Sequence, residues 1–317
     1  MTLREMTRAD VGAGVRLCRL SHWNQVARDW EQFLSLAPGG ATVAVDDSGE
    51  VIGSVATMRY LALSAEFGSQ NGVRDVHRHP LRGLPPVPLP GDPAPATLAW
   101  LAMVLVDPAH RGVGIGMRLL ERGLAQAADV TAVGLDATPL GQPLYEKLGF
   151  RAASTFTRME SDTAQLQGGT RARWPQVRRA TLADGQDIVR LDGGVTGLDR
   201  RAMLEWLHVG APECSWVYEG ADGIEGVLLG RHGHHAVHVG PVVAASVAVA
   251  DALLSAARAD PDRPVFIDIA DDRPGWRARV EALGFRQQRP FTRMYRGPWR
   301  PDGDASRLFA IIGPEFG

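Results

Sequence analysis

Cysteine is scarce in this chain of 317 residues, which contains only Cys18 and Cys214. The two lie far apart, and neither belongs to a Cys-x-x-Cys pair or to a Cys/His cluster with metal-ligand spacing. The sequence therefore predicts neither a disulfide framework nor a metal site. Because free cysteines are typical of a reducing compartment, we expect a cytoplasmic protein.

An excess of charge of one sign is also missing. The 34 basic residues nearly balance the 36 acidic ones, and no basic block occurs, which excludes the electrostatic footprint of a nucleic-acid-binding protein. Long hydrophobic runs are lacking too. Val242 to Ala250 is broken by Ser246 and is far shorter than the ~20 residues that a membrane-spanning helix needs. We expect neither a nucleic-acid partner nor a membrane partner.

What the sequence does contain is an internal repeat. LGFRAASTFTRM at residues 148–159 and LGFRQQRPFTRM at residues 283–294 share their first four and last four residues. A weaker pair, MTRAD at 6–10 and ATLAD at 180–184, places a Thr three residues before an Asp, as at a helix N-cap. We interpret the chain as a tandem duplication, with domains at 1–160 and 175–297 and a tail at 298–317.

The first copy is longer than the second, and most of the surplus is a Pro-rich insertion at 68–97. Seven of the 21 prolines lie between Pro80 and Pro95, and prolines remove the donors that a strand ladder needs, so we expect a loop or flap there. A polar stretch at 161–174 is the predicted join between the copies. The tail ends in LFAIIGPEF, which is apolar enough that we expect it to pack against the rest of the protein.

Hydrophobic periodicity in the first copy predicts an α/β fold with a mixed sheet flanked by helices on both faces. The expected helices are at 7–21, 24–36, 114–128 and 143–148, and the expected strands at 41–45, 51–60, 98–106, 130–136 and 151–160.

A glycine-rich loop joins the apolar strand at 98–106 to the following helix. In VDPAHRGVGIGMRLL, at 106–120, Gly112, Gly114 and Gly116 alternate before the helix. Unpaired backbone N–H groups at a helix N-terminus form an anion site, most often for phosphate. The spacing fits neither the G-x-G-x-x-G dinucleotide fingerprint nor a P-loop.

This loop resembles the acetyl-CoA loop of the GCN5-related N-acetyltransferase (GNAT) superfamily, Arg/Gln-x-x-Gly-x-Gly/Ala, with Arg111, Gly114 and Gly116 in the motif positions. A second family motif resembles TPLGQPLYEKLGF at 138–150, with Thr138 where Asn is common and Gly141 where Ala is common. The resemblance implies two tandem GNAT-like domains, each a twisted mixed sheet flanked by helices. It also implies an acetyl-CoA-dependent N-acetyltransferase that acts by direct transfer to the primary amine of a small molecule, as a monomer or homodimer.

The resemblance assigns roles residue by residue. Tyr145 is expected to be the general acid for the departing sulfur. Coenzyme A is expected to bind along the strand, at the loop and beside the second motif, at Val104, Leu105, Val106, Arg111, Gly112, Val113, Gly114, Ile115, Gly116 and Thr138. The first two helices of the family line the acceptor site, and in this chain they carry Trp23, Asn24, Gln25 and Asp29.

The general base stays open, because LAWLAMVLV at 98–106 has no acid or base where some family members place Glu. A water relay is one alternative. The candidate residues are Asp29, Glu31, His77, His79, His232, His234, His235, His238 and the C-terminal carboxylate of Gly317. The histidine cluster at 232–238 alternates as a strand does, which favours a half-exposed strand face over a metal site.

The second copy is expected to be degenerate. Aligning Val239-Gly240-Pro241 with Val106-Asp107-Pro108 replaces the loop glycines by valines, and Val280 stands where the first copy has Tyr145. Such a domain can form a wall of the acceptor cleft or pair sheets with the first copy, and the two FTRM segments are the expected contact. The alternatives are an acyl-CoA-binding regulatory protein without turnover and a protein N-acetyltransferase.

Overall fold

In the computed structural model the described residues are 1–63, 97–162, 174–257, 263–298, 300–301 and 303–317. The predicted insertion at 68–97 and the join at 161–174 lie almost entirely outside these residues, as do His77 and His79. Within the described part of the chain, no helix is both long enough and apolar enough to cross a membrane.

The first half follows the predicted order of elements closely. It contains β1 (Thr2–Glu5), α1 (Val11–Leu20), α2 (Ala27–Leu36), β2 (Ala41–Val45), β3 (Val51–Ala62), β4 (Thr97–Val106), α3 (Ile115–Gln126), β5 (Ala132–Ala137), α4 (Gln142–Lys147) and β6 (Arg151–Ser161).

The second half repeats this plan. It contains β7 (Val177–Arg179), α5 (Gly185–Thr196), β8 (Leu198–Asp199), α6 (Arg201–Gly210), β9 (Trp216–Gly220), β10 (Gly223–His232), β11 (Val237–Ala244), α7 (Val247–Ala257), β12 (Val265–Ala270), α8 (Pro274–Ala282), β13 (Arg286–Arg296) and β14 (Leu308–Ala310).

The weaker sequence repeat forms the same cap in both halves. Asp10 accepts a hydrogen bond from the backbone N–H of Thr7 at 2.8 Å, and Asp184 accepts one from Thr181 at 2.7 Å. Each cap opens a short 3-10 turn that leads into α1 or α5. The capping box thus satisfies N–H groups that a helix start leaves unpaired.

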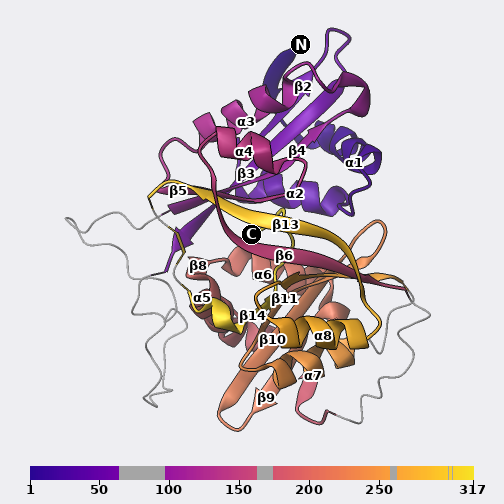
Figure 1. Ribbon diagram of the computed structural model, residues 1–317, viewed down its shortest axis with the longest axis vertical. Coiled ribbons are helices and arrows are strands. Elements are labelled where there is room, and N and C mark those ends of the chain that lie inside the picture. The colour runs from indigo at the N-terminus through magenta and orange to yellow at the C-terminus, as the bar shows by residue number, and fades with distance from the viewer. Residues whose placement is uncertain (64–96, 163–173, 258–262, 299, 302) are drawn as a thin grey trace, which may run out of the picture.

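One continuous 14-stranded sheet joins the two halves, because their last strands are exchanged. The order is β1-β2-β3-β4-β5-β13-β6-β12-β14-β11-β10-β9-β7, with β8 paired to β3. Strand β13 of the second half pairs with β5 of the first, and β6 of the first pairs with β12 of the second. Figure 1 shows β6 and β13 side by side across the middle of the molecule. The two FTRM segments meet there, with Phe156 opposite Phe291.

The exchange buries one arginine–aspartate pair in each half. Arg158 of β6 donates two hydrogen bonds of 2.7 Å to Asp268 of β12. Arg293 of β13 donates two of 2.8 Å to Asp136 of β5. Both arginines come from the FTRM repeat, and both aspartates lie on the strand that receives the exchanged partner. The repeat therefore encodes the joint between the halves as well as an element of each.

The sheet of the first half has a different core on each face. On one face Trp100 and Phe291 belong to a cluster with Leu17 of α1 and Phe33 of α2. On the other face, α3 packs its leucines 119 and 120 on the sheet in a cluster that also includes Tyr145 of α4. Strands β4, β5 and β13 therefore separate an α1/α2 face from an α3/α4 face.

The C-terminal tail packs deep in the molecule, as its apolar composition predicts. Phe316 is fully buried, and its ring stacks on Phe33 of α2 with centroids 5.0 Å apart. The Tyr60 hydroxyl donates a 2.7 Å hydrogen bond to the carbonyl of Phe316, and the Trp100 indole donates one of 3.0 Å to Pro314. The chain of the second half thus ends on the α1/α2 face of the first.

Candidate active site

A cleft of about 900 Å³ lies where strand β4 ends and helix α3 begins. Its walls come from residues 101–106 of β4, the loop to α3, the segment at 138–145 and the connection between α1 and α2. Asp136 of β5 and four residues of the second half complete the lining, the latter being Arg289, Phe291, Pro314 and Glu315.

The loop before α3 has the geometry of an anion site. Gly112 and Gly114 have φ of +84° and +86°, a conformation that favours glycine. A Cβ atom added to either would meet no atom within 4 Å, so the space beside the loop is open. Helix α3 starts at Ile115, and its first N–H groups have no partner inside the helix. Of the loop residues expected to bind coenzyme A, the cleft is lined by Arg111, Gly112, Gly114, Ile115 and Gly116 but not by Val113.

Strands β4 and β5 separate next to this loop. They pair in parallel only at Leu98, Ala99 and Trp100, although β4 continues to Val106. A bulge in β4 breaks its pairing with β3 between Ala102 and Leu105. Within the bulge Met103 has φ of +54°, and its carbonyl accepts a 2.8 Å hydrogen bond from the Ser54 hydroxyl. The predicted residues Val104, Leu105 and Val106 line the cleft along this opening.

Tyr145 lies on α4 and lines the same cleft, together with Thr138. Its ring packs against Phe150 at 6.0 Å with an angle of 70°. Burial raises the pKa of Tyr145 to about 12. The hydroxyl therefore keeps its proton over the whole neutral range and can act as a hydrogen-bond donor.

The residues predicted to contact the acceptor separate into two groups. Trp23 and Gln25 line the cleft, but Asn24 and Asp29 do not. Asn24 is buried, and its side-chain oxygen accepts hydrogen bonds from the backbone N–H groups of His235 and Ala236 at 2.8 and 3.1 Å. Asn24 therefore joins the first half to the β10–β11 hairpin of the second.

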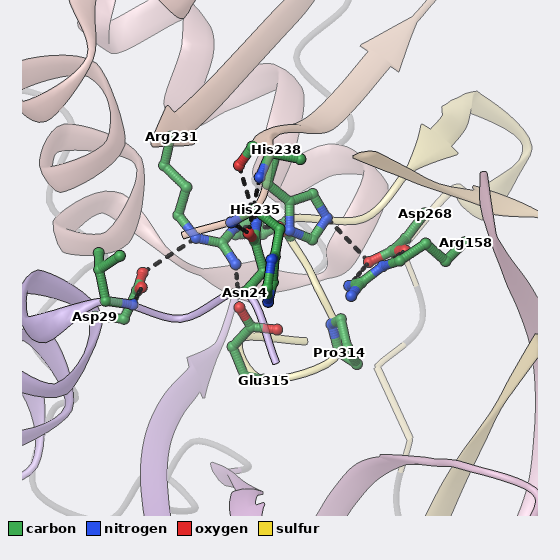
Figure 2. Close-up of polar contacts among 12 residues, drawn as sticks. Asn24, Asp29, Arg158, Arg231, His235, His238, Asp268, Pro314 and Glu315 are labelled. Atoms are coloured by element: carbon green, nitrogen blue, oxygen red, sulfur yellow. Dashed lines mark hydrogen bonds and ion pairs between the residues drawn. The ribbon is translucent and has the colours of Figure 1, made fainter. Parts of the chain in front are cut away.

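Asp29 is buried in a polar cluster beside the cleft (Figure 2). One of its oxygens is 3.1 Å from Nε of Arg231, and the other accepts the backbone N–H of Val26 at the start of α2. Arg231 also pairs with Glu315 of the tail. Burial raises the pKa of Asp29 to about 6, although the positive charge of Arg231 acts to lower it. The carboxylate of Asp29 thus pairs and hydrogen-bonds with groups of the protein itself instead of facing the cleft.

His77 and His79 lie outside the described residues, and the remaining candidates for the general base are not among the residues that line the cleft. Glu31 is exposed, and Arg200 donates to the carbonyl of the C-terminal Gly317. The histidine cluster forms a hairpin instead of one continuous strand face, because β10 ends at His232 and β11 begins at Val237. The Nε2 atom of His232 lies 2.6 Å from Glu213, and that of buried His238 lies 3.0 Å from Asp268.

Sequence patterns did not single out the four lining residues of the second half. Phe291 belongs to the repeated FTRM segment, and Pro314 and Glu315 belong to the apolar tail. The sequence predicted that both segments pack against other parts of the protein, but it assigned them no role in the site. Arg289 occupies the position that Ser154 has in the first copy, and the sequence alone gives no reason for this difference. Their place in the cleft follows from the strand exchange and from the path of the tail.

Among the described residues, the second half has no comparable loop between β11 and α7, although the sequence alignment that predicted this was wrong. Val239-Gly240-Pro241 lies inside β11, where a bulge shifts its register with β10, and so matches the bulge of β4. Just beyond the bulge of the first half, Val106 pairs with Gly53. At the same distance beyond the bulge of the second half, Val243 pairs with Val227. Val243 is therefore the structural counterpart of Val106. Only residues 245–246 then separate β11 from α7, whereas residues 107–114 separate β4 from α3.

Family models match both halves of the chain. Two models described as "Acetyltransferase (GNAT) domain" match residues 38–152 and residues 188–310, and together they cover most of the sequence.

Two curated relatives are similar over much of their length. Holothin acyltransferase from Pseudoalteromonas sp. (strain SANK 73390) is 28% identical over 221 residues, which are 69% of this chain and 73% of the relative. The protein called Uncharacterized N-acetyltransferase YitH, from Bacillus subtilis (strain 168), is 27% identical over 191 residues, which are 60% of this chain and 67% of the relative.

Solved structures share the fold of the whole chain. A putative acetyltransferase from Pyrococcus horikoshii superposes with a TM-score of 0.74 at 19% identity, covering 100% of this chain and 95% of that one. A tandem GNAT protein from the clavulanic acid biosynthesis pathway gives a TM-score of 0.61 at 16% identity, covering 94% and 99%. The arrangement of two such domains in one chain therefore recurs in solved structures.

Proposed function

Because the chain is an acyltransferase of the GNAT superfamily, we propose that it transfers an acetyl group from acetyl-CoA to the primary amine of a small molecule. The observation that carries this proposal is one cleft that joins the glycine loop before α3, the opening between β4 and β5, and Tyr145. We place the only working site in the first domain, residues 1–160, and regard 175–297 as a degenerate copy.

The residues of this cleft fit coenzyme A. Open space beside Gly112 and Gly114 lets the backbone approach a pyrophosphate, and the N-terminus of α3 favours its charge. The bulge at Met103 and the separation of β4 from β5 free backbone groups of β4 for hydrogen bonds to an extended ligand. Acetyl-CoA would supply the acyl group as an activated thioester.

Tyr145 would hold its proton at the hydroxyl and donate a hydrogen bond at the leaving group. With a pKa of about 12, the phenol is weaker as an acid than an ordinary thiol by about 3.5 units, which makes complete transfer uphill by ~5 kcal/mol. A hydrogen bond that strengthens as charge develops avoids most of this cost. Tyr145 thus acts mainly as a donor, with the proton moving late.

The acceptor must lose a proton, because well under 1% of a primary amine of pKa ~10.4 is neutral at pH 7. An amide bond forms as the thioester C–S bond breaks, and the ammonium nitrogen loses two protons. One proton is released to water, and the other balances the proton that the departing sulfur takes up as the free thiol. Strand β4 offers no acid or base for this step. We therefore route the proton through water in the cleft.

The test is thiol release from acetyl-CoA with a panel of small amines and with peptides, for wild type and for Tyr145→Phe. Without the hydroxyl, kcat should fall ten- to hundredfold while acetyl-CoA binding by calorimetry is unchanged. Tyr218→Phe is the matched control, because Tyr218 lies on β9 outside the cleft lining. Binding of acetyl-CoA without turnover of any amine would instead support a regulatory protein, and turnover of peptides alone a protein N-acetyltransferase.

A further inference from the structure

The α1/α2 side of the cleft contains two side chains of opposite charge that both come from the second half of the chain. Arg289 lies two residues before Phe291 on a regular stretch of β13, so the two side chains share the face that packs on α1 and α2. Glu315 lies beside Phe316, which stacks on Phe33 of α2. Ile115, which directly follows the glycine loop, and Tyr145 belong to the opposite, α3/α4 face.

Arg289 is a partly buried cation whose charge is not neutralised by an ion pair. Among the described residues, no carboxylate lies within ion-pair distance of its guanidinium, and its buried Nε has no hydrogen-bond acceptor. The guanidinium rests over the Phe291 ring at 5.1 Å. Burial, and then the nearby charge of Arg158, lower the pKa of Arg289 to about 10. A guanidinium held in this way is suited to bind an anion.

A bulge in β13 positions this arginine. Gln287 pairs with Met159 and Arg289 with Arg158, so Gln288 is the extra residue between them. The first copy has a similar irregularity in β6 but carries Ser154 at the equivalent position. The cation is therefore specific to the second copy, whose exchanged strand lines the cleft of the first.

Glu315 is the acidic counterpart on the same side. It is only 3% exposed, and its Oε1 pairs with Arg231 (Figure 2). Its Oε2 is buried as well. Burial opposes its ionisation, but the charge of Arg231 and a hydrogen bond from the Gln25 side chain help to lower the pKa of Glu315. The group is thus a carboxylate at neutral pH in the lining of the cleft.

We propose that the acceptor is an amine that also carries a carboxylate, as an amino acid does, with its carboxylate bound by Arg289 and its ammonium group directed toward Glu315. This inference rests on the proposed acetyltransferase function and names the substrate class of the same site. The anion at Arg289 is not a phosphate of coenzyme A, because the anion loop lies on the opposite face of the sheet.

Glu315 attracts the ammonium group through its negative charge and does not remove its proton. The pKa of this carboxyl is below its usual value of 4.5, and an α-amino group has a pKa of ~8 and a lysine-type amine one of ~10.4, so direct transfer is unfavourable by more than about three units, or over a thousandfold. The proton therefore leaves through water, as proposed above, and Glu315 fixes the orientation of the amine.

The experiment compares matched acceptors, namely several amino acids, their carboxamides and the corresponding amines without a carboxyl group, by thiol release. For wild type, kcat/KM should be at least tenfold higher for the carboxylates. In Arg289→Gln this preference should disappear through a ten- to hundredfold rise in KM, with kcat nearly unchanged and acetyl-CoA binding intact. Arg289→Lys should restore part of it. Arg286→Gln on the same strand is the control, because Arg286 is exposed and pairs with Asp162 at the surface.

A binding measurement separates failure of this inference from failure of the proposed function. N-acetylated amino acids and their amides are titrated into protein saturated with coenzyme A. The inference expects tighter binding of the carboxylates to wild type and no difference in Arg289→Gln, even if no turnover is detected. Equal turnover of carboxylates and plain amines, or equal binding of acids and amides by wild type, would overturn the inference. Equal turnover would leave the acetyltransferase proposal standing.

Discussion

The two halves of the molecule share one plan but differ in the connection that follows the bulged strand. After the bulged strand, the first half uses residues 107–114 to reach α3, whereas the second uses residues 245–246 to reach α7. Only the longer connection contains glycines at positive φ beside open space. An anion site at a helix start needs backbone N–H groups of the preceding chain as well as a helix dipole, and the shorter connection offers less chain for this while the fold is kept.

The second half contributes side chains to the cleft of the first. Its exchanged strand and its tail supply Arg289, Phe291, Pro314 and Glu315 to the cleft lining. The joint that brings them there is present twice, as Arg158–Asp268 and Arg293–Asp136. The halves are therefore alike where they hold each other and unlike where a ligand would bind.

The largest expected effect concerns the two buried arginine–aspartate pairs, which are alike in both halves. Arg158→Ala leaves Asp268 buried without its arginine partner, and Arg293→Ala does the same to Asp136. Each change should lower the free energy of unfolding by about 3–5 kcal/mol, measured by urea unfolding. The loss should be slightly smaller for Arg293, whose side chain is 12% exposed against 1% for Arg158.

A double variant provides the control for this prediction. Arg158→Met combined with Asp268→Leu removes both charges, so it should recover most of the lost stability. A loss below about 1 kcal/mol in either single variant would show that the exchanged strands do not depend on these pairs.

The next effect sharpens the difference between the halves. Gly114→Val puts a β-branched residue at φ +86° in the glycine loop, and it should weaken acetyl-CoA binding at least a hundredfold by calorimetry. Gly49→Val is the matched control, since Gly49 has φ +89° in a turn between β2 and β3 and equally open surroundings. Both variants carry similar backbone strain, but only the first should lose binding.

The stoichiometry in the same titration bears directly on the second half. One site per chain is expected for wild type. Two sites, or binding that survives Gly114→Val, would mean that residues 175–297 retain a site despite their short connection.

Much of the fold follows from local sequence. The capping Thr and Asp pairs, the apolar strand at 98–106 and the glycine loop each specify a nearby structure, and the repeat of FTRM predicted where the halves meet. Tyr145 and the loop residues could be placed because both motifs are contiguous in sequence.

Long-range pairing explains what the sequence did not reveal. Arg289 reaches the cleft through the exchanged strand, and Glu315 reaches it through the path of the tail. Hydrophobic periodicity in the sequence predicts neither of these arrangements. Asn24 and Asp29 look like acceptor contacts on a polar helix start, but their partners, the β10–β11 hairpin and Arg231, lie some 200 residues away. The alignment at Val239 failed because a bulge, not a loop, carries the Gly-Pro pair.

The smallest expected effect concerns the caps, which are alike in both halves. Thr7 and Thr181 donate hydroxyl hydrogen bonds of 2.9 and 3.0 Å to Asp10 and Asp184. Thr7→Ala and Thr181→Ala should therefore each lower the free energy of unfolding by about 1 kcal/mol at pH 7. The two losses should be equal within error.

The pH dependence of that cost follows from the carboxylates. Hydrogen bonds from Arg4 and Arg178 hold the pKa of Asp10 and Asp184 well below the usual range. A depressed pKa means that the stabilisation is complete above the ordinary Asp pKa of ~3.9 and is lost as the pH falls toward the folded-state value. Both carboxylates are still ionised in the folded protein at pH 3, so the cost of both Thr→Ala changes, measured by urea unfolding, should be the same at pH 7 and pH 3. A cost that shrinks in one half only would show that the two caps, despite equal geometry, are not equivalent.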